Sequence, residues 1–210
     1  MAVSLVAATA VTLGAQTTSR HGRPFPPEDL GLLEGPDRDA WQKPSLIMDA
    51  LGIADGAVVA DIGAGGGWFT VRLARRVGPN GLVYAEDVQR QMVDAIERRV
   101  RREGLDNVRT IIGLDDDPRL PEGELDAVLI VDAYHEVTDR VALMRNVARA
   151  LKPSGKLGIV DFRNDGWGPG PPMDQRIVPD VVIADGRAAG LRLLSKEDFL
   201  PYQYLLVFGR

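Results

Sequence analysis

A short apolar run followed by closely spaced glycines constrains this chain more than any other feature. Residues 58–62 read Val-Val-Ala-Asp-Ile, and glycines stand at positions 63, 65, 66 and 67. The apolar run is typical of a buried strand, and glycines let the backbone turn sharply and approach a ligand closely. A helix that starts after such a turn presents unpaired N–H groups there. We therefore expect a small polar ligand at this turn.

The spacing of the glycines argues against a dinucleotide-binding loop. The fingerprint G-x-G-x-x-G, read from Gly63, needs a glycine where the chain has Trp68. The chain instead places an acidic residue before alternating glycines, as Asp61-x-Gly63-x-Gly65-x-Gly67. In this it resembles the class I S-adenosylmethionine-dependent methyltransferases, whose first motif has that form. The resemblance implies S-adenosyl-L-methionine as the cofactor.

Strand-like and helix-like segments alternate over residues 45–210, which the resemblance covers. This alternation predicts a doubly wound α/β sheet. The expected strands are residues 57–62, 82–85, 108–112, 125–131 and 156–162. Two final apolar stretches, 191–194 and 202–208, have no helical pattern between them, so we expect them to pair as an antiparallel hairpin. The expected fold is thus a seven-stranded Rossmann-like sheet, mostly parallel, with the C-terminal hairpin of a methyltransferase.

The chain divides into three parts. Residues 1–16 are mostly small and apolar, too short to span a bilayer, and resemble an export signal without its basic start. An export signal, a membrane tether and a simple tail are the alternatives. Residues 17–44 are rich in Pro, Gly and charge, and we interpret them as a loop-rich arm with at most one short helix. Its Phe25 and Trp41 either close over the site as a lid or pack the arm onto the domain of residues 45–210, where Ser45 is expected to cap the first helix.

Composition narrows the range of partners. The chain has 25 basic and 30 acidic residues, a net charge of −5, which argues against nucleic acid or an anionic membrane as the main partner. The absence of cysteine excludes disulfides and a thiol nucleophile. We expect a small-molecule partner and no integral membrane span, and a homodimer is compatible with the sequence. The cofactor favours a cytoplasmic location, with export or tethering through residues 1–16 as the alternative.

The resemblance implies cofactor contacts at the carboxyl ends of the first strands. The residues expected to meet the methionine part are Asp61, Gly63, Ala64, Gly65 and Gly67. Asp87, at the end of the second strand, is expected to accept both ribose hydroxyls. Glu86 is the alternative, because neighbouring side chains of a strand point to opposite faces.

The resemblance also implies Val88 after Asp87 as a cofactor contact, the Leu114 side chain against the adenine ring, and a carboxylate that accepts from the adenine amino group. The candidates for that carboxylate are Asp115, Asp116 and Asp117, of which we favour Asp116.

The end of the fourth strand carries the catalytic candidates. There Asp132 is expected to contact the cofactor's amino group or to order the loop. His135 is the best general base, since its unperturbed pKa of about 6.5 suits proton removal near neutrality, and Tyr134 is the second catalytic candidate. In the alternative interpretation His135 is bonded into the loop and holds Tyr134 or Glu136.

No metal is expected, although one alternative remains open. Asp132, Asp161 and Asn164 follow the fourth and fifth strands, which resembles the magnesium-dependent O-methyltransferases. Those enzymes have an adjacent Asp-Asn pair, whereas here the two residues are three apart.

The resulting hypothesis is methyl transfer to an unidentified small acceptor, by O- or N-methylation through in-line displacement. The arm, Tyr134 and the loop 163–175 with Trp167 are expected to select the acceptor. The alternatives are a non-catalytic module that binds S-adenosylmethionine or S-adenosylhomocysteine and, less favoured, a nicotinamide-dependent oxidoreductase.

Overall fold

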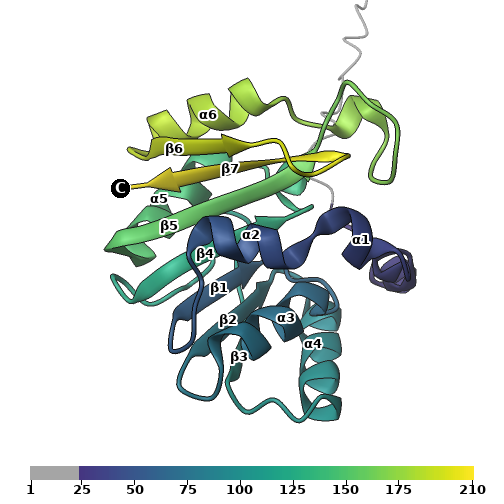
Figure 1. The fold of residues 1–210 in the computed structure, drawn as a ribbon, viewed down its shortest axis with the longest axis vertical. Coiled ribbons are helices and arrows are strands. Elements are labelled where there is room, and N and C mark those ends of the chain that lie inside the picture. Colours follow the sequence, from purple (N-terminus) through teal and green to yellow (C-terminus); the bar gives the residue numbers. More distant parts are fainter. Residues whose placement is uncertain (1–23) are drawn as a thin grey trace, which may run out of the picture.

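A seven-stranded sheet forms the centre of the molecule (Figure 1). The computed structural model describes residues 24–210, so the expected apolar segment 1–16 and the first residues of the arm lie outside the described residues. The strands are β1 Val58–Ile62, β2 Leu82–Asp87, β3 Val108–Ile112, β4 Leu125–Val131, β5 Leu151–Phe162, β6 Arg192–Glu197 and β7 Gln203–Gly209. The α-helices are α1 Arg38–Gln42, α2 Pro44–Leu51, α3 Trp68–Val77, α4 Arg90–Arg102, α5 Arg140–Ala150 and α6 Pro179–Ala188. Three 3-10 helices are η1 Pro27–Glu34, η2 Tyr134–Glu136 and η3 Met173–Gln175.

The topology is that of a doubly wound sheet. The strand order is β3-β2-β1-β4-β5-β7-β6, with β1 to β5 parallel. β7 runs antiparallel to both β5 and β6, which confirms the C-terminal hairpin. Because the chain order reverses between β1 and β4, the carboxyl ends of these strands form the crevice where such sheets bind ligands.

Helices cover both faces of the sheet, so its middle strands are buried on both sides. α2, α3 and α4 pack on one face of the sheet, with α4 over β2. α5 and α6 pack on the other face. β4 lies in the centre and alternates between the two cores, with Val128 in one and Leu129 in the other. This is why its sequence is almost continuously apolar. Within residues 24–210 no helix combines the length and the apolar character needed to cross a bilayer.

The arm has more helical structure than its sequence predicted. η1 and α1 lie at the edge of the sheet where the parallel strands end (Figure 1), whereas we expected at most one short helix. The expected cap at Ser45 is wrong: α2 begins at Pro44, after Lys43 takes a left-handed conformation with φ of 48°. Proline suits the first position of a helix because its φ is already helical and its missing N–H would have no partner there.

We expect Leu129→Ala to lower the free energy of unfolding by about 3 kcal/mol, because it removes a fully buried side chain from the central strand and leaves a cavity. Urea denaturation of the purified chain measures this change. Leu46→Ala, at an exposed position of α2, is the matched control and should change stability by less than about 0.5 kcal/mol. Equal losses in the two variants would contradict the assignment of β4 to the core.

Candidate functional site

A cavity of about 1150 Å³ lies at the carboxyl edge of the parallel strands. Its walls come from the glycine turn after β1, the ends of β2, β4 and β5, the arm, and the loop 163–175. The site is therefore in the crevice expected from the topology. Its lining residues range from Pro24 in the arm to Tyr202 just before β7.

The glycine turn adopts a conformation that other residues avoid. Gly63 has φ of 65° and Gly65 has φ of 55°, both in the left-handed region that favours glycine. At Gly63 a Cβ would also come within 2.5 Å of the Cβ of Ala133. Ala64 and Gly65 line the cavity, whereas Gly67 does not: it precedes α3 and packs against Ile96.

Asp87 supports this turn from the neighbouring strand. Its Oδ2 accepts from the Gly65 N–H at 3.0 Å, and its Oδ1 accepts from the Gln89 N–H at 2.9 Å. Burial raises the pKa of Asp87, while these hydrogen bonds favour its charged form. A carboxylate has about four acceptor positions, so those directed to the cavity remain for a ligand.

Glu86 also lines the cavity, which the sequence did not predict. Which of Glu86 and Asp87 meets the ligand stays a prediction, because both residues line the cavity. Glu86 lies beneath the turn, where its Oε2 accepts from the Gly63 N–H at 3.3 Å and its Oε1 has no partner in the described residues. Burial, assisted by the charge of Asp87, raises the pKa of Glu86 to about 8.

Asp61 joins β1 to α3 at the base of the turn. Its carboxylate accepts from the Thr70 hydroxyl at 2.6 Å. Burial raises the pKa of Asp61 to about 6, although the hydrogen bond from Thr70 opposes this. Trp68, in the position where the dinucleotide motif has glycine, packs against two guanidinium groups. The Arg38 group lies 4.3 Å and the Arg72 group 3.4 Å from the ring centre.

The loop after β3 contributes a different acidic residue from the one we favoured. Val88, Leu114 and Asp115 line the cavity, and Asp116 does not. The backbone carbonyl of Asp116 instead accepts from the Asn146 side chain at 2.7 Å. The cavity lining thus includes Asp115, one of the two alternatives to Asp116, and the choice among the three aspartates stays a prediction.

Asp132 anchors the arm to the end of β4. Its carboxylate accepts from Arg38 at 3.2 Å, from Gln42 at 3.0 Å and from the Gln203 side chain. Burial raises the pKa of Asp132 to about 6, and the charge of Arg38 opposes this. Arg38 and Gln42 are four residues apart, and this spacing indicates that their side chains lie on the same face of α1. The sequence did not indicate that Asp132 is the residue that both contact.

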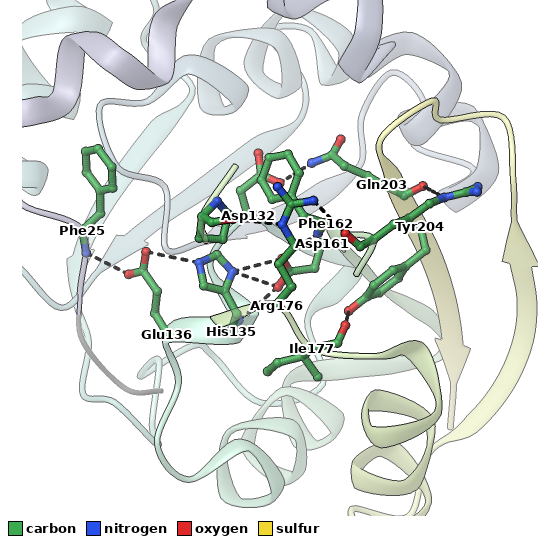
Figure 2. A network of polar contacts seen from close by, with 12 residues as sticks. Phe25, Asp132, His135, Glu136, Asp161, Phe162, Arg176, Ile177, Gln203 and Tyr204 are labelled. Carbon is green, nitrogen blue, oxygen red and sulfur yellow. Dashed lines mark hydrogen bonds and ion pairs between the residues drawn. The ribbon is translucent and has the colours of Figure 1, made fainter. Parts of the chain in front are cut away.

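His135 faces the cavity between two carboxylates (Figure 2). Its Nδ1 lies 3.0 and 3.1 Å from the two oxygens of Asp161, and its Nε2 lies 3.9 Å from Glu136. Glu136 in turn accepts from the backbone N–H of Phe25 in the arm at 3.0 Å. Burial lowers the pKa of His135, but the hydrogen bond and charge of Asp161 outweigh it and leave the pKa raised. His135 thus belongs to a chain of polar contacts and still lines the cavity, with 8% of its surface exposed.

Tyr134 does not take part in this arrangement, which corrects its catalytic assignment. It is fully buried, and its hydroxyl donates to Asp185 of α6 at 3.0 Å. Burial and the Asp185 charge raise its pKa, so the phenol stays neutral. The 3-10 turn η2 directs Tyr134 into the core beside Met144 and His135 toward the cavity.

Two of the three residues of the magnesium alternative, Asp132 and Asp161, make other contacts. Asp132 binds the arm, and Asp161 accepts from His135 and from the Phe162 N–H. Across residues 24–210, no three His, Asp or Glu side chains gather as a set of metal ligands.

Aromatic and proline side chains line the remaining part of the cavity. The Trp41 ring lies 6.2 Å from Phe162 and 6.1 Å from Tyr202, measured between centres. Gly170 packs against the Phe162 ring so closely that a Cβ would come within 2.6 Å. Trp167, which we expected to help select the acceptor, is 96% exposed and lies outside the cavity lining. Prolines of the same loop line it instead.

Comparisons with known proteins agree with this geometry. Residues 59–155 match the model of a family described as methyltransferase domain. The ubiquinone/menaquinone biosynthesis C-methyltransferase UbiE of Pasteurella multocida is 31% identical over 123 residues, which are 58% of this chain and 45% of the relative. The UbiE protein of Hahella chejuensis is 30% identical over 58% of this chain and 49% of its own length. The chain thus spans about half the length of these relatives.

Solved structures extend the likeness to most of the chain. A SAM-dependent methyltransferase from Aquifex aeolicus has a TM-score of 0.83 and 27% identity, covering 88% of this chain and 98% of its own. The (4+2)-cyclase SpnF has a TM-score of 0.69 and 18% identity, covering 81% of this chain and 80% of its own, and shares the fold alone.

The residues present fit the cofactor of this family. The glycine turn leaves room for close backbone approach, Asp87 borders the same cavity with acceptor positions free, and Val88 and Leu114 offer apolar contacts. This site, this sheet topology and these matches support a class I S-adenosylmethionine-dependent methyltransferase domain, and the cofactor that they imply is S-adenosyl-L-methionine.

Proposed function

We propose that this protein transfers a methyl group from S-adenosylmethionine to a small, flat, apolar acceptor that carries an ionisable hydroxyl or amine group. The observation that carries this proposal is a shared cavity. His135, held by Asp161, lines the same cavity as the glycine turn and Asp87. A base and a cofactor site that open into one enclosed space suit group transfer from one ligand to another.

The cofactor half of the cavity has a role for each group that lines it. We assign Asp61 and the turn Gly63–Gly65 to the methionine part, Asp87 to the ribose, and Val88, Leu114 and Asp115 to the adenine. S-adenosylmethionine supplies an electrophilic methyl group on a positively charged sulfur. Acidic side chains suit this charge, and Asp61, Asp87 and Asp132 line the cavity.

The acceptor half of the cavity indicates the class of acceptor. Its walls include Phe25, Trp41, Phe162 and Tyr202, which suit a flat apolar body. Glu136 borders it, and burial raises the pKa of Glu136 to about 7, so its charged form at higher pH would disfavour an anionic acceptor. A cavity of about 1150 Å³ has room for a cofactor and a small molecule together.

His135 is assigned as the base that removes the acceptor's proton. Imidazole suits this step because its pKa lies near neutrality. The same step would serve O- and N-methylation, and also C-methylation of a ring whose hydroxyl is ionised. The similar UbiE proteins are named C-methyltransferases, so we add a carbon nucleophile to the oxygen and nitrogen nucleophiles expected from the sequence.

The arm is assigned as a lid over the reacting groups. Arg38 holds it to Asp132, and Phe25 holds it to Glu136 and, through its carbonyl, to Gln89 at 2.9 Å. These contacts connect the arm to both sides of the cavity. A closed arm keeps water away from the reacting groups and aligns the acceptor.

We expect Gly65→Val to weaken binding of S-adenosylhomocysteine roughly ten- to a hundredfold, the effect of about 1.4–2.8 kcal/mol of backbone strain at the binding turn. Isothermal titration calorimetry measures the affinity. The reason is that valine avoids a φ of 55° and would move the Gly65 N–H away from Asp87.

Gly104→Val is the matched control for this variant. Gly104 has φ of 64°, and a Cβ added to it would meet no atom within 4 Å. A Cβ added to Gly65 would make only ordinary van der Waals contacts, so neither variant introduces a clash at Cβ. Both variants carry the same backbone strain, but only one lies in the site. Equal affinities of the two variants for S-adenosylhomocysteine would mean that the turn is structural.

We expect the wild-type chain to transfer tritium from methyl-labelled S-adenosylmethionine to hydroquinone or aniline, and not to benzoate. His135→Ala should lower kcat about 100- to 1000-fold and leave the affinity for S-adenosylhomocysteine unchanged, because the base acts on the acceptor. A His135→Ala variant with wild-type kcat would remove the base assignment. Binding of S-adenosylhomocysteine without transfer to any of these probes would favour the accessory-module alternative.

A further inference from the structure

We propose that Asp161 is a positioning residue that holds the proton of His135 on Nδ1, so that Nε2 presents its lone pair to the cavity. This inference rests on the proposed function for its purpose, because an unprotonated Nε2 is what would accept the acceptor's proton. Its geometry stands independently in the contacts of three residues, Asp161, His135 and Glu136 (Figure 2).

The first step is the environment of Asp161. It lies near the end of β5 with no exposed surface, and its carboxylate accepts from the backbone N–H groups of His135 at 3.0 Å and Phe162 at 2.8 Å. Two donors on a fixed backbone hold the carboxylate in one orientation. In that orientation both of its oxygens lie within 3.1 Å of His135 Nδ1.

The second step is the tautomer that these contacts select. An ionised carboxylate only accepts hydrogen bonds, and a neutral imidazole has one nitrogen that donates and one that accepts. A hydrogen bond at Nδ1 therefore requires the proton to be on Nδ1. The partner of one ring nitrogen decides the state of the other, so Nε2 is left with its lone pair.

The third step is that Nε2 stays available. Among residues 24–210, its nearest carboxylate is Glu136, whose Oε1 lies 3.9 Å away, beyond hydrogen-bonding distance. The other oxygen of Glu136 is held by the Phe25 N–H of the arm. Nε2 thus has no hydrogen-bonded carboxylate in residues 24–210, and His135 lines the cavity.

A purely structural role for Asp161 has to be separated from this one. Its hydrogen bond to the His135 backbone N–H helps to shape η2 whatever the ring does. A loss of stability or activity alone would therefore be ambiguous. The position of the proton on the ring is the readout that a structural role would not move.

The experiment uses the full chain with His21→Ala, which leaves His135 as the single histidine. With ¹⁵N-labelled histidine, long-range ¹H–¹⁵N spectra at a pH above the pKa of His135 show which ring nitrogen carries the proton. The expected result is a protonated Nδ1 and an unprotonated Nε2. A protonated Nε2 would overturn the proposal, and this measurement needs no change at Asp161.

Asp161→Asn tests the cause. The side-chain oxygen of the asparagine can still accept from a backbone N–H, but its NH₂ group donates toward Nδ1 of His135. The proton of the ring should therefore move from Nδ1 to Nε2, and Nδ1 should give the signal of an unprotonated nitrogen. Asp185→Asn is the matched control, because Asp185 binds Tyr134 of the same turn without touching His135, and it should leave the tautomer unchanged. An unchanged tautomer in Asp161→Asn, or the same change in both variants, would overturn the proposal.

The two proposals fail in different ways. The spectra report the His135–Asp161 pair with no cofactor or acceptor present, so they do not depend on methyl transfer. Loss of the proposed function would appear as absent binding of S-adenosylhomocysteine or absent label transfer, with the spectra as expected.

Discussion

The hydrogen bond from the Gly65 N–H to Asp87 is the interaction on which the site depends. It joins the turn after β1 to the end of β2, and it forms only because Gly65 takes a left-handed conformation. The neighbouring contact, from the Gly63 N–H to Glu86, repeats the arrangement beneath the turn. Backbone N–H groups thus compensate part of the cost of burying two adjacent acidic side chains. The result is an acidic cavity at the carboxyl edge of the sheet, suited to a ligand that carries positive charge.

The same polar groups connect the site to the arm. Asp132 and Glu136 follow β4, and both accept hydrogen bonds from the arm, one from Arg38 and one from Phe25. The arm is therefore held by the segment that carries the proposed base. If the arm acts as the proposed lid, the same contacts would both close the cavity and fix the position of Glu136 beside His135.

The sequence rules failed where regular structure ends. Alternation along a strand predicted that one of Glu86 and Asp87 would face the ligand, whereas both residues contribute to the cavity wall at the end of β2, with the Gly63 N–H bonded to one and the Gly65 N–H to the other. Tyr134 and His135 are neighbours, and a 3-10 turn sends one into the core and the other to the cavity. No periodicity applies to such turns, so the choice between adjacent residues was not available from the pattern.

The sequence by itself determined the sheet, its order of strands and helices, and the cofactor motif. These follow from local signals: apolar periodicity, the glycines after β1, and an acidic residue at the end of β2. Only the tertiary structure decided the partners of the polar side chains. Asp161 meets His135 across 26 residues and Arg38 meets Asp132 across 94, because the carboxyl ends of β4 and β5 and the arm converge at one edge. A pattern along the chain records which residues are polar, whereas the packing of distant segments decides which of them meet.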